Sequence, residues 1–161
     1  MKKIGIDPGQ TGAISVMEDG VVIKVFDMPV MGRLHGEGYE VDASSLAAEF
    51  FEIGTGTISE VVLEQVDGRP KKGPNGPVKL GSTSVFNFGE GFGIVKGVLG
   101  ALQVPVRMVT PQRWKKSAGL TGKDKDAARS LAIQLHPEAA EYLRRKKDVG
   151  RADAIMIARF G

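Results

Sequence analysis

A chain of 161 residues, 42% of them hydrophobic and 25% charged, with a net charge of +3, has the size and composition of one folded domain spanning 1–161, which excludes the disordered and collagen-like classes. The absence of cysteine excludes a disulfide framework, a thiolate zinc site and a cysteine nucleophile. No apolar run approaches the roughly 20 residues of a membrane span, and acidic Asp7 interrupts any signal-peptide core, so we expect a cytoplasmic protein without membrane contact.

Three strands are predicted within the first 27 residues. They cover Lys2 to Asp7, Thr11 to Met17 and Val21 to Asp27, and the Asp19-Gly20 pair between the last two is typical of a hairpin turn. Residues 28–41 are rich in glycine and polar groups, and we expect them to form a loop.

A helix is predicted to begin after Asp42, a good N-cap, because Leu46, Phe50 and Ile53 repeat at helical spacing. A Gly-Thr-Gly segment ends it. The following strand, Ile58 to Val66, is apolar without clear alternation, which indicates burial on both faces of a sheet.

Residues 67–79 combine three prolines, three glycines and four positive charges, and we expect a basic loop without regular structure. The longest helix is predicted over 84–103, where Gly89, Gly93 and Gly97 share one face. Each mid-helix glycine costs about 1 kcal/mol against alanine. Something must therefore approach this face closely: either the sheet of the same chain, or the same helix of a second copy in a homodimer.

A strand over 104–109 is followed only by helices. They are predicted at 112–117, 123–135, 138–147 and 151–160. This order of elements predicts an α/β fold with a five-stranded mixed sheet, in which the first three strands are antiparallel, parallel crossovers add the rest, and helices flank the sheet.

The charge is distributed unevenly along the chain. Residues 1–68 hold 4 basic and 12 acidic residues, a net charge of −8, whereas residues 69–161 hold 18 and 7, a net charge of +11. The second part predicts a basic surface suited to a polyanion, with acidic groups concentrated in the first part. For any single charge, a solvated helix face is the alternative.

Four acidic residues are candidates for chemistry. Asp7 ends the first strand, Glu64 interrupts a strand that is expected to be buried, and Asp153 shares the apolar stripe of the last helix. A turn-forming role for Asp7 and a helix N-cap for Asp153 are the alternatives. Asp148 is more typical of a helix N-cap, but it lies just before the same predicted helix.

The first and fourth strands are expected to be neighbours, about 4.8 Å apart, which brings Asp7 and Glu64 together. Carboxylates that close repel each other, which raises one pKa or requires a cation. With Asp153 from a helix packed on those strands, they form an all-oxygen site. Mg²⁺ and Mn²⁺ prefer such ligands, and two ions about 4 Å apart can activate a water and stabilise the leaving oxygen of a phosphodiester.

The motifs together resemble a known family. Gly5-Ile6-Asp7-Pro8-Gly9, Leu63-Glu64-Gln65-Val66 and Arg151-Ala152-Asp153-Ala154 resemble, in order and spacing, the RuvC-type Holliday junction resolvases, particularly the phage-encoded ones, of the ribonuclease H-like superfamily. The resemblance covers nearly the whole chain. It extends to Phe88-Gly89-Glu90 and to residues 102–106, 111–116 and 122–125.

The resemblance implies a homodimeric, Mg²⁺-dependent endonuclease of ribonuclease H-like fold that nicks two opposing strands of a four-way DNA junction. It assigns metal binding to Asp7, Glu64 and Asp153, to which we add Asp148, and it places Lys115 and Lys125 near the scissile phosphate. We expect dimerisation through the helix at 84–103. Further candidate contacts to the DNA are Lys116, Lys123, Arg69, Lys71 and Lys72. A phage enzyme of this kind works in the cytoplasm of its bacterial host.

Two positions depart from the family pattern. Bacterial members carry a further acid three residues before the last one, where this chain has Gly150, and an aromatic wedge after the glutamate of the fourth strand, where it has Asp67. Elsewhere, Trp114 lies between two basic residues, and it either stacks on a base or anchors a short helix.

Three other function classes compete with a resolvase. A broader branched-DNA nuclease uses the same chemistry, and a non-catalytic nucleic-acid-binding module shares the fold. Actin-like and sugar-kinase ATPases also begin with an Asp followed by Gly and Thr, as Asp7, Gly9 and Thr11 do here, but they need two such domains to enclose a nucleotide.

Overall fold

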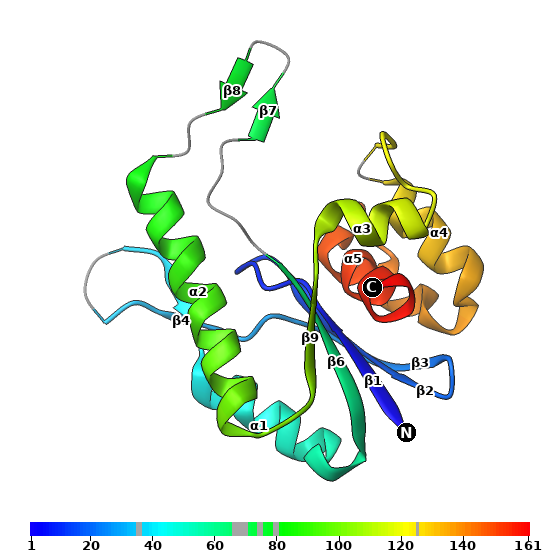
Figure 1. Cartoon of the computed structure of the whole chain (residues 1–161), viewed down its shortest axis with the longest axis horizontal. Coiled ribbons are helices and arrows are strands. Elements are labelled where there is room, and N and C mark those ends of the chain that lie inside the picture. Colours follow the sequence, from blue (N-terminus) through cyan, green and yellow to red (C-terminus); the bar gives the residue numbers. More distant parts are fainter. Residues whose placement is uncertain (35–36, 66–70, 74–75, 79–80, 125) are drawn as a thin grey trace.

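The computed structural model describes residues 1–34, 37–65, 71–73, 76–78, 81–124 and 126–161. Its centre is a five-stranded sheet with the order β3-β2-β1-β6-β9 (Figure 1). The strands are β1 (Lys2–Ile6), β2 (Ala13–Glu18), β3 (Val21–Asp27), β6 (Ile58–Glu64) and β9 (Val106–Val109). β1, β2 and β3 are antiparallel neighbours, whereas β1, β6 and β9 run parallel. The predicted mixed α/β sheet is confirmed.

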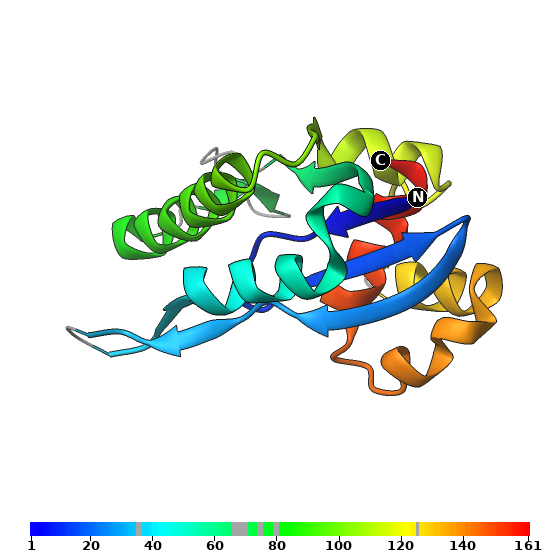
Figure 2. The same ribbon diagram turned by 90° about the horizontal axis from the view of Figure 1, so that it is seen from below.

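Helices cover both faces of this sheet (Figure 1 and Figure 2). On one face lie α1 (Ala43–Ile53) and α2 (Ser82–Ala101), and on the other lie α3 (Pro111–Ser117), α4 (Ala127–Leu135) and α5 (Val149–Phe160). Successive strand residues point to opposite faces, so Ile4 and Ile6 of β1 join the core under α1 and α2, while Val62 of β6 joins the core under α5. None of the described helices is long and apolar enough to cross a membrane.

Local sequence signals correctly predicted the ends of several elements. Asp42 caps α1 by accepting hydrogen bonds from the backbone N–H groups of Ser44 and Ser45, and Thr110 caps α3 by accepting one from Arg113. The turn between β2 and β3 takes positive φ at Asp19 and Gly20, as a tight hairpin of this kind requires. The predicted helix start after Asp42 and the hairpin are therefore confirmed.

Two predicted loops contain strands. The segment 28–41 forms an antiparallel ribbon of β4 (Val30–Gly32) and β5 (Tyr39–Val41), and the segment 67–79 contains a second one of β7 (Lys71–Gly73) and β8 (Gly76–Val78). A two-stranded ribbon accommodates proline and glycine because each of its strands has a free edge, where a proline loses no ladder hydrogen bond.

Two helix predictions need correction. The segment predicted as helical at 138–147 forms a 3-10 helix, η2 (Pro137–Leu143), instead. A second 3-10 helix, the short η1 (Thr55–Thr57), precedes β6. The helix predicted from 123 begins only at Ala127. The Asp124 carboxylate accepts hydrogen bonds from the N–H groups of Asp126 and Ala127, so Asp124 lies before the helix and bonds N–H groups at its start.

The glycine face of α2 points away from the protein. The buried side of α2 consists of Gly91, Val95 and Leu99. At the three glycines of the shared face, Gly89, Gly93 and Gly97, an added Cβ would meet nothing within 4 Å. The alternative in which these glycines allow α2 to approach its own sheet is therefore wrong.

Candidate functional site

Asp7 and Glu64 extend from two neighbouring strands at the same end of the sheet. β1 and β6 are parallel and pair Ile6 with Leu63. The residues that directly follow this pair, Asp7 and Glu64, are both acidic. Ile6 and Leu63 both belong to the core under α1 and α2. Because side chains alternate, Asp7 and Glu64 are directed toward the opposite face, which α5 covers.

The third carboxylate comes from α5, which lies unusually close to the sheet. A Cβ added to Gly5 would stand 2.2 Å from the carbonyl oxygen of Ala154 and 2.4 Å from the amide nitrogen of Ala158, so only a glycine lets the backbone of α5 pack directly on β1. Asp153 precedes Ala154 inside this helix, which begins at Val149. Asp153 is therefore an interior helix residue rather than an N-cap, and it is held over the ends of β1 and β6.

The electrostatics show that the three carboxylates interact. The pKa of Asp153 is raised from 3.8 to about 7 by burial and by the nearby Asp7 carboxylate, with a smaller contribution from Glu64, while the Lys115 ammonium opposes this shift. Asp7 also accepts a hydrogen bond of 3.3 Å from the backbone N–H of Gly9. The chain thus concentrates negative charge at this edge of the sheet, with the Lys115 ammonium nearby.

Trp114 orients Glu64 from the core side. Its indole Nε1–H donates a hydrogen bond of 2.7 Å to Oε1 of Glu64, and the side chain is fully buried. The Lys115 ammonium lies 5.1 Å from the centre of the Trp114 ring. Trp114 therefore does not offer a face for a base; it fills the core under α5 and fixes one site carboxylate, a role that no local sequence signal indicated.

The donor set fits a hard divalent cation, since it consists of carboxylate oxygens whose mutual repulsion a cation would relieve. In the part of the chain that the structure describes, no group of three or more His, Cys, Asp or Glu side chains is arranged to hold a metal ion as it stands. The residues Asp7, Glu64 and Asp153 match Mg²⁺ in chemistry, and the side chains would have to adjust to enclose it.

The structure does not bring Asp148 to this group. Both of its carboxylate oxygens are bonded by Arg145, at 2.7 Å and 2.9 Å from the guanidinium and 2.8 Å from the backbone N–H, and Asp148 is not among the groups that shift the pKa of Asp153. Nor can position 150 carry an acid in this backbone, because a Cβ on Gly150 would lie 2.6 Å from the carbonyl oxygen of Thr11. The proposed replacement of the family's fourth acid by Asp148 is thus not supported by its contacts.

The predicted DNA contacts are placed unevenly. Lys115 is half-buried beside the carboxylates, and Lys116 and Lys123 are exposed around α3. Lys71 and Lys72 belong to β7. Arg69 and Lys125, together with the wedge position Asp67, lie outside the described residues.

Removing the charge of Asp153 should stabilise the metal-free protein in a pH-dependent way. Because its folded pKa exceeds its unfolded value of 3.8, the folded state binds the proton more tightly, and this contribution to stability is lost as the pH rises toward 7. We expect Asp153→Asn to raise the free energy of unfolding by about 2 to 4 kcal/mol at pH 8 and by little at pH 4. Urea unfolding in the presence of a chelator measures this.

The exposed Asp19→Asn is the matched control, and it should change stability equally little at both pH values. A gain for Asp153→Asn that is the same at pH 4 and pH 8 would contradict the charge cluster.

Comparison with known proteins gives two likenesses. No family model matches the chain. The chain is 42% identical over 78 residues to the chloroplastic Holliday junction resolvase MOC1 of Chlamydomonas reinhardtii, a match that covers 47% of this chain and 8% of that protein. The chain thus spans only a small part of this curated relative.

Solved structures match over nearly the whole length. The chain superposes on RuvC of T. thermophilus in complex with a Holliday junction substrate with a TM-score of 0.54 at 18% identity, covering 98% of this chain and 90% of that one. A second Thermus thermophilus RuvC structure gives a TM-score of 0.53 at 19% identity and covers 98% and 91%. The chain therefore has the fold of RuvC.

Proposed function

We propose that this protein is a divalent-metal-dependent endonuclease that resolves four-way DNA junctions by hydrolysing phosphodiester bonds in paired, symmetric nicks. The observation that carries the proposal is the group of Asp7, Glu64 and Asp153, in which burial and the neighbouring carboxylates raise the pKa of Asp153 to about 7. The RuvC fold and the partial likeness to a Holliday junction resolvase support the choice of DNA junctions as the substrate.

Each residue of the site has a role in this proposal. Asp7, Glu64 and Asp153 would hold Mg²⁺, or Mn²⁺ in its place, and Trp114 keeps the Glu64 carboxylate oriented through its hydrogen bond. Lys115 offers positive charge to a phosphate beside the carboxylates. The bound metal would supply an activated water and stabilise charge on the leaving oxygen.

Cleavage of synthetic DNA tests the proposal. The protein is incubated with a four-way junction and with a linear duplex of the same sequences, with Mg²⁺, with Mn²⁺ or with chelator. Paired metal-dependent nicks in the junction alone are expected. Binding without cutting would favour a non-catalytic module of the same fold, and equal cutting of all substrates would favour a broader branched-DNA or duplex nuclease.

Exposed lysines around α3 should contribute to DNA affinity through phosphate contacts. We expect Lys116→Ala and Lys123→Ala each to lower the slope of log affinity against log salt by about 1, because each contact releases a counterion. Fluorescence anisotropy of a labelled junction across a salt series, in chelator, measures the slope. Lys24→Ala, on edge strand β3 and paired with Glu49, is the control. If Lys116→Ala and Lys123→Ala had the same slope as the wild type, a basic DNA-binding surface around α3 would be contradicted.

We also infer that the protein is a homodimer through α2. The exposed glycine face, with Val85 and Phe86 beside it, allows another helix to come close. Gly93→Glu should convert the dimer to a monomer in sedimentation and leave the fold of the protomer intact, since no described residue lies within 4 Å of a Cβ added at this position. Ala48→Glu, at an exposed position of α1, should leave the dimer intact. A wild-type protein that sediments as a monomer at tens of micromolar would contradict the inference.

A further inference from the structure

The helix that carries Asp153 is attached to its surroundings by an arginine in its first turn. Arg151 donates hydrogen bonds of 2.7 Å from Nε and 2.8 Å from Nη2 to the two carboxylate oxygens of Asp27. A third hydrogen bond, of 3.2 Å, runs from Nη1 to the carbonyl oxygen of Tyr142. These three hydrogen bonds, which we call the Arg151 clamp, join α5 to β3 and η2. Because the guanidinium is planar and holds both carboxylate oxygens, the clamp fixes direction as well as distance.

Asp27 has a fixed place relative to Asp7. Asp27 pairs with Ala13 in the ladder between β2 and β3, and the carbonyl oxygen of Ala13 accepts a hydrogen bond of 3.0 Å from the backbone N–H of Asp7. The next residue along, Met28, donates a backbone hydrogen bond of 2.9 Å to the carbonyl oxygen of Gly12. The Arg151 clamp therefore ties α5 to the same hydrogen-bonded backbone that carries one of the site carboxylates.

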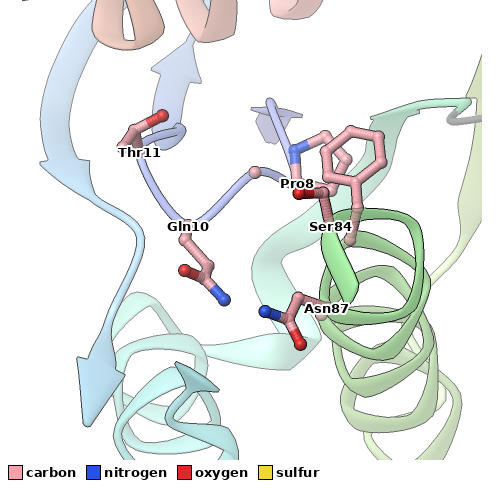
Figure 3. Close-up of a pocket in the computed structure, with 8 residues that line it drawn as sticks. Pro8, Gln10, Thr11, Ser84 and Asn87 are labelled. Carbon is pink, nitrogen blue, oxygen red and sulfur yellow. The ribbon is translucent and has the colours of Figure 1, made fainter. Parts of the chain in front are cut away.

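The residue before Arg151 brings the first turn of α5 close to this part of the chain. A Cβ added to Gly150 would lie 2.6 Å from the carbonyl oxygen of Thr11, which belongs to the turn between β1 and β2 (Figure 3). Gly150 allows this approach, but a glycine has no side chain that could fix the helix there. Arg151 supplies the directional contacts.

We propose that Arg151 is a positioning residue for the metal site: the clamp sets the direction in which α5 presents Asp153 to the other two site carboxylates. With about 3.6 residues per turn, residues 151 and 153 leave the helix on nearly opposite sides. Arg151 therefore acts through the backbone of the first turn and not by touching the ion. The inference rests on the proposed function, because a bound metal requires its carboxylate ligands at matched distances.

A matched arginine lies at the other end of α5. Arg107 donates two hydrogen bonds to the Glu60 carboxylate and one to the carbonyl oxygen of Gly161, the residue after the helix. It makes the same three kinds of contact as Arg151, so Arg107→Ala removes the same charge and the same kind of anchor. The Asp27 side chain is 64% exposed, and ion pairs with an exposed partner contribute little to stability. A loss of metal affinity in the clamp variants would therefore not reflect unfolding.

Binding of Mn²⁺ to the protein without DNA tests the clamp. The electron paramagnetic resonance signal of free Mn²⁺ falls as the ion binds, which gives the dissociation constant. We expect Arg151→Ala and Asp27→Ala each to weaken binding by about tenfold, and the double variant to weaken it no further, because all three lose the same contacts. The sign separates this from a charge effect, since loss of a nearby cation would by charge alone tighten Mn²⁺ binding.

Two further variants complete the design. Arg151→Lys keeps the charge but loses the planar fork, so it should also weaken Mn²⁺ binding, and it decides the question if Arg151→Ala does not fold. Arg107→Ala should bind Mn²⁺ as the wild type does. Circular dichroism at the assay temperature shows which variants are folded. Folded Arg151 variants that bind Mn²⁺ as tightly as the wild type, or more tightly, overturn the inference and leave the proposed function standing.

Junction cleavage gives a second readout. In the Arg151 variants, the Mn²⁺ concentration for half-maximal cleavage should rise by about tenfold, while junction affinity in chelator stays that of the wild type. An equal loss of junction affinity would contradict a role confined to the metal site. Weaker Mn²⁺ binding by the clamp variants in a protein that cuts no junction would support the clamp and refute the resolvase. A wild type that binds no Mn²⁺ would refute both.

Discussion

Asp7→Asn is expected to abolish cleavage of a four-way junction while preserving the fold and the binding of DNA. The change removes one negative charge and one anionic metal ligand but keeps the size of the side chain, and the Asn oxygen can still accept the hydrogen bond from Gly9. The loss of cleavage should be about a thousandfold or more, which corresponds to roughly 4 kcal/mol of transition-state stabilisation. Gel assays of nicking with Mg²⁺ measure this effect.

Binding in chelator should be equal to that of the wild type or slightly tighter, because one carboxylate no longer repels the phosphates. Glu18→Gln, at the opposite end of β2, is the control that should cut normally. Wild-type nicking by Asp7→Asn would refute the site assignment, whereas loss of both binding and folding would mean that Asp7 is a structural residue.

Gly5→Ala is expected to cause a large loss of stability. The new Cβ would stand 2.2 Å from the carbonyl oxygen of Ala154 and 2.4 Å from the amide nitrogen of Ala158, so β1 and α5 must separate. We expect the free energy of unfolding to fall by about 3 kcal/mol or more, because the clash is with backbone that cannot rotate away. Urea denaturation measures the change.

Cleavage by any folded Gly5→Ala protein should also fall, since Asp153 moves with Ala154 away from the ends of β1 and β6. The control is Gly32→Ala, where an added Cβ meets nothing within 4 Å and stability should change by about 0.5 kcal/mol or less. A Gly5→Ala protein as stable as the wild type would contradict the close packing of α5 on β1.

The predictions that succeeded rest on signals within one segment. The cap at Asp42, the Asp19-Gly20 turn and the continuous apolar run of β6 each act over a few residues, so composition and spacing are sufficient to read them. The predicted pairing of the first and fourth strands followed from general rules for crossover connections. Those rules also brought Asp7 and Glu64 to the same edge.

The predictions that failed depended on partners elsewhere. The ribbon strands β4 and β7 form in segments whose composition predicted loops, because a ribbon is decided by pairing with another strand rather than by propensity. The exposure of the glycines of α2 could not be predicted either, since periodicity shows which residues share a face and not what that face meets.

The α/β class, the mixed sheet and the grouping of Asp7, Glu64 and Asp153 could be predicted from the residues alone, because strand alternation and the positions of strand ends are properties of the local chain. How these carboxylates are held became visible only in the folded chain: Trp114 reaches Glu64 across 50 positions of the sequence, and Gly5 allows the helix that carries Asp153 to pack against β1. The ion pair between Arg151 and Asp27 also exists only in the folded chain. Contacts of this kind depend on packing between distant segments, for which a single sequence carries no periodic signal.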